Sequence, residues 1–139
     1  MGKSVRDAMT SNPCTIDGER PVAYAAKMMK DENVGIAPVV EGDRLVGTLT
    51  DRDIVVRVVA EGREPQTVNV REVMSIAPVT VEPEQDLDEA LRLMASHQVR
   101  RLPVVEDGDR VVGVLAQADV AEEAKAKKTG ELVEEISKD

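Results

Sequence analysis

An internal repeat constrains the fold of this 139-residue chain more than any other feature, because residues 5–54 resemble residues 70–120. At an offset of 65, identical residues recur for Val5, Arg6, Met9, Pro13, Thr15, Ala25, Met29, Val34, Pro38, Val39 and Val40. One residue inserted at a turn raises the offset to 66, at which the recurring residues are Arg44, Val46, Gly47, Leu49 and Asp53. So many matches in one register indicate a tandem repeat. We therefore expect two similar units related by a pseudo-twofold axis, with a cleft between them as the expected place for a ligand.

Length and composition exclude several functions. Two units of about 60 residues would each be marginally stable alone, so we expect them to share one core. Tyr24 is the only aromatic residue and the net charge is −9, which argues against nucleic-acid binding, because phosphates need a basic surface and bases a stacking platform. The single cysteine, Cys14, and the single histidine, His97, form no recognisable metal or catalytic cluster. We expect no bound metal, no catalytic residue and no enzymatic activity.

The chain also lacks the patterns of a membrane or secreted protein. It has no apolar run of the ~20 residues needed to cross a bilayer, and its first residues contain no apolar signal core. With one cysteine it can form no internal disulfide. We expect a cytoplasmic protein.

The first unit has the pattern of one helix, a hairpin and a second helix. Pro21 is placed to start a helix whose apolar residues recur at helical spacing, and Asn33 is placed to end it. Two strands are predicted at 36–40 and 45–49, and a helix over 50–60. A short extended segment, 14–16, precedes them.

The second unit repeats this order. Asp86 and Glu89 form a capping pair for a helix, and the strands 102–105 and 111–115 follow, before a helix from Ala118. The short extended segment here is 79–81. The predicted fold is thus α+β, with two tandem βαββα units whose sheets form the shared core. Its predicted divisions are a first unit 1–62, a linker 63–69, a second unit 70–124 and a charged C-terminal tail 125–139.

The strongest candidate for a binding site is the segment around Thr50 and Asp53, where a strand runs directly into a helix. Free backbone N–H groups at such a point can bind an anion, and an aspartate one turn on can accept hydrogen bonds from ribose hydroxyls. Thr50-x-x-Asp53 is also a capping box that would stabilise any helix, and local spacing favours this second interpretation. The second unit has Ala116 and Asp119 at the same positions, so its aspartate persists without the capping hydroxyl. That persistence favours a further use for the aspartate.

Arg100 and Arg101 stand just before a strand of the second unit, where the first unit has Gly35 and Ile36. If the hairpins pack about a pseudo-twofold axis, this pair can reach the Thr50 segment and bind phosphate through charge-assisted hydrogen bonds. A solvated pair matched to nearby glutamates is an equally open interpretation.

Taken together, these motifs resemble the cystathionine-β-synthase-type (CBS) regulatory domain, here as a tandem pair or Bateman module over about residues 5–123. The matching features in both units are the opening Val-Arg-x-x-Met, the Pro-Val-Val strand and the ending Gly-x-Leu-x-x-x-Asp. The runs Leu-Thr-Asp-Arg-Asp-Ile-Val and His-Gln-Val-Arg-Arg-Leu-Pro-Val are similar to those of small stand-alone bacterial members.

The resemblance implies a dimer of such modules with an adenosine-containing ligand in the clefts between repeats. It assigns the ribose to Asp53 and the phosphate to Thr50, with Arg100, Arg101 and Arg52 as further phosphate ligands. It places the adenine against strand edges near four residues: Thr15, Ile16, Ile36 and Ala37. Asp119 marks a weaker second site, because Ala116 lacks the hydroxyl.

Three functions compete. The first is a non-enzymatic sensor that binds a nucleotide of the AMP, ADP or ATP type as a regulatory ligand and signals through dimer packing to an unknown effector protein. The alternatives are a ligand-free dimerisation module, in which Thr50 and Asp53 only cap a helix, and a module that binds S-adenosylmethionine or NAD.

Overall fold

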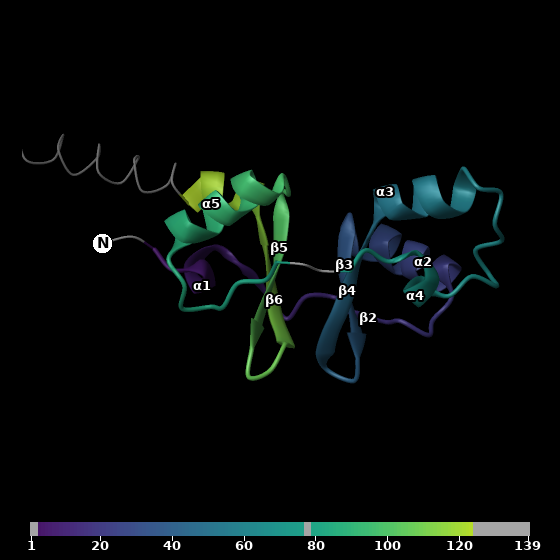
Figure 1. Cartoon of the computed structure of the whole chain (residues 1–139), viewed down its shortest axis with the longest axis horizontal. Coiled ribbons are helices and arrows are strands. Elements are labelled where there is room, and N and C mark those ends of the chain that lie inside the picture. The colour runs from purple at the N-terminus through teal and green to yellow at the C-terminus, as the bar shows by residue number, and fades with distance from the viewer. Residues whose placement is uncertain (1–2, 77–78, 124–139) are drawn as a thin grey trace, which may run out of the picture.

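A computed structural model describes residues 3–76 and 79–123 of the chain (Figure 1). The first unit contains, in order, β2 (Ile16–Asp17), α2 (Val22–Glu32), β3 (Ile36–Glu41), β4 (Arg44–Thr50), α3 (Asp51–Ile54) and η1 (Val55–Val59). α2 ends at Asn33, whose φ of 55° lies in the left-handed region that stops a helix. The predicted order of elements in this unit is confirmed. The predicted tail 125–139 lies outside the described residues.

The remaining elements are α1 (Val5–Ala8), β1 (Thr10–Ser11), α4 (Val70–Val73), α5 (Leu87–His97), β5 (Arg101–Glu106), β6 (Arg110–Ala116) and a helix over 117–123. α5 ends at Gln98 with a φ of 55°, as α2 does at the equivalent Asn33. The extended segment expected at 79–81 forms only an isolated parallel bridge between Val81 and Val104. The structure thus contains the two related units that the repeat predicted.

The last helix of the first unit is irregular. The helix expected over 50–60 is α-helical only in α3 and continues as the π-helical η1. This second part contains four valines, Val55, Val56, Val58 and Val59. Such β-branched side chains crowd the preceding turn of a regular helix, and a wider turn coincides with them here. The helix predicted over this range is therefore present, and only its second part departs from α-helical geometry.

The strands form a sheet in the order β1-β6-β4-β3-β2, with β5 also paired to β6. β3 with β4, and β5 with β6, are antiparallel hairpins with equivalent irregularities, between Val39 and Val40 and between Val104 and Val105. The hairpins meet through the pair Arg44 and Arg110. They stand next to each other in the middle of the molecule, with the helices of each unit on the outer sides (Figure 1). The starts of β3 and β5 therefore lie on opposite sides of the boundary between the two hairpins.

The buried residues form two clusters instead of the one shared core that was expected, and the units exchange a short helix between these clusters. Val70 and Val73 of α4 are buried with the first unit, in a cluster around Leu49 and Val39. Val5 of α1 is buried with the second unit, in a cluster around Leu115. Each cluster of buried residues therefore contains both repeats of the sequence, and neither repeat could complete its core alone.

No helix among the described residues is both long and apolar enough to span a bilayer.

Candidate functional site

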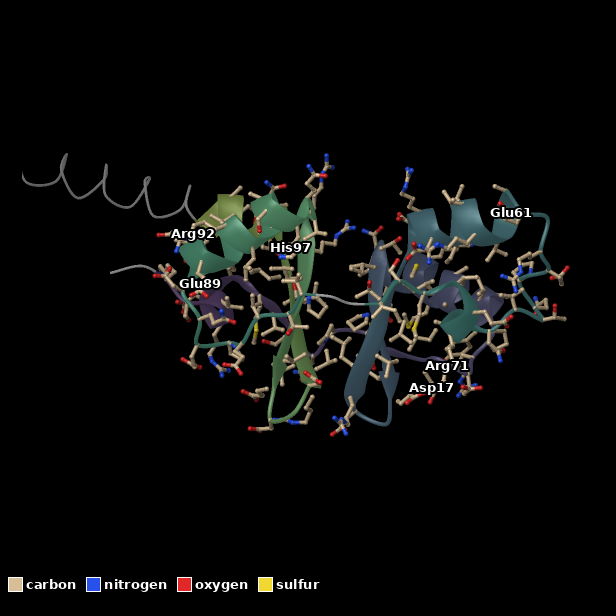
Figure 2. All side chains as sticks on the ribbon, in the orientation of Figure 1. Asp17, Glu61, Arg71, Glu89, Arg92 and His97 are labelled. Atoms are coloured by element: carbon tan, nitrogen blue, oxygen red, sulfur yellow. The ribbon has the colours of Figure 1, made fainter. Side chains whose placement is uncertain are left out.

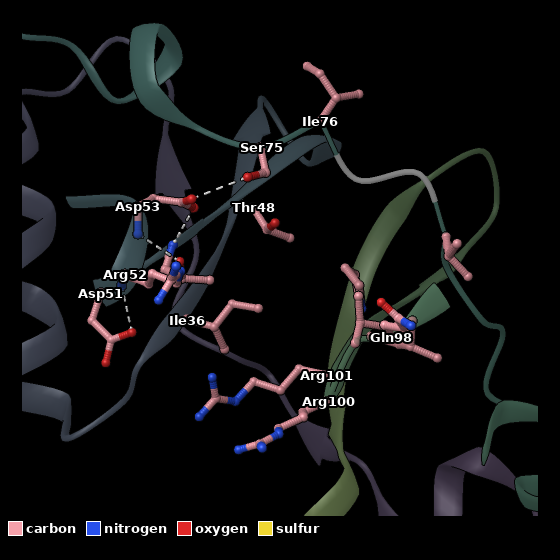
Figure 3. A pocket seen from close by; sticks show the side chains of 15 residues that line it. Ile36, Thr48, Asp51, Arg52, Asp53, Ser75, Ile76, Gln98, Arg100 and Arg101 are labelled. Carbon is pink, nitrogen blue, oxygen red and sulfur yellow. Dashed lines mark hydrogen bonds between the residues drawn. The ribbon is translucent and has the colours of Figure 1, made fainter. Parts of the chain in front are cut away.

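A cavity of about 440 Å³ lies between the two hairpins. The first unit contributes to its wall through Ile36, Thr48 and 50–53, and the second through 98–103. Ser75, Ile76 and Val79, from the connection that follows α4, complete the described wall. This hollow, called the first cavity below, is therefore built by both units, as the pseudo-twofold argument anticipated (Figure 3).

Thr50 and Asp53 form the capping box that their spacing predicted. The Asp53 backbone N–H donates to Thr50 Oγ1 at 3.0 Å, and the Thr50 N–H donates to Asp53 Oδ2 at 3.0 Å. Asp53 Oδ1 accepts a hydrogen bond from Ser75 Oγ at 3.3 Å and lies 4.0 Å from Arg57 Nε (Figure 3). Only 12% of the Asp53 side chain is exposed. Both carboxylate oxygens are thus held by the protein at the cavity wall.

The backbone groups that were expected to bind an anion here are already occupied. The Asp51 N–H donates to the carbonyl of Gly35 at 3.0 Å, the Arg52 N–H donates to Asp51 Oδ1 at 2.8 Å, and the Asp53 N–H is used by Thr50. The expectation of free N–H groups at this helix start is therefore wrong, because the carbonyl of Gly35 and the side chains of Thr50 and Asp51 accept their hydrogen bonds. Any phosphate in this cavity must depend on side chains.

Three arginines line the first cavity and can serve that purpose. Arg100 and Arg101 extend from the start of β5 towards the first unit (Figure 3). Arg52 lies in α3, two residues after Thr50. With Asp51 and Asp53, the described wall carries three cations and two carboxylates. The structure thus brings together Thr50, Asp53 and all three arginines singled out from the sequence.

Only one of the four residues expected near adenine lines the first cavity. Ile36 lines the first cavity, whereas Thr15, Ile16 and Ala37 do not. Ile16 and Ala37 are 2% and 0% exposed and face the core of the first unit, because neighbouring residues of a strand point to opposite sides. An apolar wall is supplied instead by residues that sequence reasoning missed: Ile76, Val79, Val99 and Leu102.

Ser75 was also missed, although the sequence contains a signal for it. It contacts Asp53, and its equivalent in the first unit is Thr10, so a hydroxyl recurs at this position. Thr10 lines a second hollow of about 530 Å³, together with Asp119, Ala116 and Gly35. This second cavity is the pseudo-twofold counterpart of the first.

The second cavity has different chemistry. Cys14 and Glu32 line it, and burial together with the Glu32 carboxylate raises the pKa of the Cys14 thiol. Ala116 brings no hydroxyl beside Asp119. Across residues 3–76 and 79–123, no group of three or more His, Cys, Asp or Glu side chains is arranged to hold a metal ion.

The repeats also match a known family, over residues 5–60 and again over residues 70–126, and that family is described as the CBS domain. The chain belongs to the CBS domain family. A CBS domain-containing protein of Bacillus subtilis, YhcV, is 48% identical over 118 residues, which is 85% of this chain and 83% of YhcV.

Two solved structures show CBS folds with small molecules bound. The CBS domain pair of protein MJ0100, in complex with 5′-methylthioadenosine and S-adenosyl-L-methionine, has a TM-score of 0.82 at 25% identity and covers 91% of this chain and 99% of that one. CBSX2 in complex with AMP has a TM-score of 0.79 at 26% identity, with the same coverage of both chains. The architecture is therefore that of a CBS domain pair, whose relatives include modules that bind adenosine compounds.

Replacing the two equivalent aspartates separates the capping role from other roles. We expect Asp53→Ala to lower the free energy of unfolding by about 1 kcal/mol, because it removes half of a capping box and the contact with Ser75. Asp119→Ala should cost clearly less, because Ala116 offers no capping hydroxyl. Urea unfolding followed by circular dichroism measures both. Equal losses for the two variants would contradict the capping role of Asp53.

Proposed function

We propose that this protein is a regulatory CBS module that binds an adenine nucleotide of the AMP, ADP or ATP type in the first cavity. The proposal rests on one observation: Arg100, Arg101, Thr50 and Asp53 all line the same cavity of about 440 Å³. A cavity of this volume is in the range of small-molecule sites. Cations for a phosphate, a carboxylate for a ribose and an apolar wall for a base occur in it together.

Each part of the ligand then has a partner. Asp53 accepts hydrogen bonds from ribose hydroxyls in place of the bond from Ser75. Thr50 donates its hydroxyl towards the phosphate, since that oxygen now only accepts from the Asp53 N–H. Arg100 and Arg101 bind the phosphate, with Arg52 beside them, because guanidinium and phosphate form short, charge-assisted pairs. The base lies against Ile76, which is 71% exposed without a ligand.

The signal passes to a partner through a homodimer. Val55, Val56 and Val59 of η1 are 57%, 44% and 66% exposed, an apolar face that a second copy would cover. The capping box connects Asp53 to the first turn of the same helical segment. A nucleotide that competes for Asp53 would therefore alter the start of the helix that carries this face. A change in packing requires the ligand to prefer one arrangement.

Two other functions keep specific support. Both Asp53 oxygens already accept hydrogen bonds within the protein. This agrees with a ligand-free dimerisation module, in which Asp53 serves only to cap its helix. The likeness to the MJ0100 domain pair, whose complex contains S-adenosyl-L-methionine, supports a ligand without phosphate. NAD stays a further candidate, since it contains both a ribose and a diphosphate.

Thermal unfolding with a panel of ligands tests the proposal. AMP, ADP, ATP, NAD and S-adenosylmethionine are each added to the parent protein, to Asp53→Ala and to Asp119→Ala. A ligand at a hundredfold excess over its dissociation constant stabilises the native state by about 2.7 kcal/mol, so the melting temperature should rise. We expect a nucleotide shift in the parent and in Asp119→Ala, and its loss in Asp53→Ala. The absence of any shift in the parent would favour the dimerisation module.

A further inference from the structure

Arg101 is shared by the two cavities. It lines the first cavity beside Arg100 and also lines the second beside Asp119. Its Nη2 atom lies 3.5 Å from the point that a Cβ on Gly35 would occupy, and Asp51 Oδ2 lies 3.1 Å from the same point. Gly35 belongs to the wall of the second cavity and Asp51 to the wall of the first. The guanidinium thus stands at the partition between them.

The two cavities depend on this arginine to different degrees. The first has Arg52 and Arg100 as further cations. Among the described residues that line the second, Arg101 is the only cation, and it faces the carboxylates of Glu32 and Asp119. The position equivalent to Arg100 is Gly35, which has no side chain. Without Arg101, the charged side chains that line the second cavity would all be carboxylates.

We propose that Arg101 makes the two cavities compete for anions, so that a phosphate-bearing ligand in the first cavity weakens the binding of a second one, while an uncharged ribose compound still binds the second cavity. This inference rests on the proposed nucleotide site and adds its regulation. A phosphate in the first cavity holds the Arg101 guanidinium there. The second cavity then presents Glu32 and Asp119, which repel an incoming phosphate.

Size does not explain the difference between the cavities. The second, at about 530 Å³, is no smaller than the first, at about 440 Å³. Asp119 occupies the position of Asp53, so ribose hydroxyls have an acceptor in both cavities. What the second cavity lacks is any group for the phosphate besides the shared Arg101, since Ala116 replaces Thr50 and Gly35 replaces Arg100. The ligand class that fits it is a nucleoside without a phosphate.

Isothermal titration calorimetry with AMP and adenosine tests this assignment. On the parent protein we expect AMP to bind at one molecule per chain, with any second AMP weaker by about tenfold or more, the effect of losing one charged hydrogen bond. Adenosine added to AMP-saturated protein should bind at one further molecule per chain. Asp119→Ala should remove the adenosine site and keep the AMP site.

A gain of function tests the charge argument. Gly35→Arg gives the second cavity the counterpart of Arg100, and we expect two AMP molecules per chain. The new Cβ would meet the end of the flexible Asp51 side chain at 3.1 Å, which can move aside. Gly35→Gln is the matched control, since it adds a long polar side chain without a charge, and it should still bind one AMP. Retention of the first AMP site shows that each variant is folded.

Each other outcome has a distinct meaning. Two equivalent AMP sites in the parent would overturn the competition and leave the proposed function intact. One AMP site without an adenosine site would overturn the second cavity as a binding site. One AMP per chain in a folded Gly35→Arg would overturn the role of charge, and the adenosine measurement on the parent decides independently if that variant does not fold. No AMP binding at all would overturn the proposed function and this inference together.

Discussion

The Gly47→Ala variant should lose about 3 kcal/mol of unfolding free energy, at the upper end of what overpacking costs. A Cβ on Gly47 would lie 2.6 Å from the backbone oxygen of Ser75 and 2.7 Å from Met74 Sδ. The oxygen cannot rotate away, because the backbones of Thr48 and Ser75 exchange two hydrogen bonds of 2.8 Å. Room for the methyl group would therefore require the segment that follows α4, which contains Met74 and Ser75, to move away from β4. Urea unfolding measures the loss directly.

Gly18→Ala is the matched control for this variant. Its Cβ would meet Arg71 Cβ and Val39 Cγ1 at 3.5 Å, which is ordinary contact, so the unfolding free energy should change little. Gly113, the repeat equivalent of Gly47, faces Met9 Sδ at 2.8 Å and should be as intolerant as Gly47. A stable Gly47→Ala protein would contradict the close packing of this segment on β4. The segment carries Ser75 and Ile76, so a folded variant should also bind nucleotide more weakly.

Joint replacement of Arg100 and Arg101 by glutamine should weaken AMP binding at least about 100-fold, since each charged hydrogen bond contributes roughly 1.5–3 kcal/mol. The two guanidiniums supply most of the positive charge of the first cavity, and the backbone N–H groups near Thr50 are already used. Calorimetric titration of the double variant with AMP measures the loss. Raising the salt concentration should weaken AMP binding in the parent, since screening reduces charge–charge attraction.

Two controls assign the loss to phosphate recognition. Arg92→Gln removes a positive charge from the outer surface of α5, away from the cavities, and should leave the AMP affinity unchanged (Figure 2). Adenosine, which lacks the phosphate, should lose little affinity in the double variant. An equal loss of adenosine and AMP would mean that the arginines maintain the shape of the cavity and do not bind phosphate.

Local patterns in the sequence predicted most of the elements correctly. The helices α2 and α5 follow from apolar residues at helical spacing, and both hairpins from short apolar runs around turn residues, since these signals involve neighbours in the chain. The capping box of Thr50 and Asp53 is equally local. The repeat also predicted a contact between distant residues, because a pseudo-twofold arrangement implies that Arg100 and Arg101 face the Thr50 segment.

Other features depend on contacts between distant residues. No local pattern indicates that the Asp51 N–H bonds to Gly35 across the hairpin, or that Ile16 and Ala37 face the core, because strand register decides both. The valines of η1 coincide with its π-helical turn, but β-branched residues alone do not predict such a turn. The first two of these features changed the expected ligand contacts, and none of the three changed the fold.

The sequence by itself determined the repeat, the order of helices and strands within each unit, and membership of the CBS domain family. These properties follow from residue patterns that are close in the chain or recur at one offset. Only the tertiary structure decided that α1 and α4 exchange between the cores, that Ser75 meets Asp53, and that Arg101 borders both cavities. Such contacts join residues far apart in the chain, and they form only when both hairpins and both short helices are packed together.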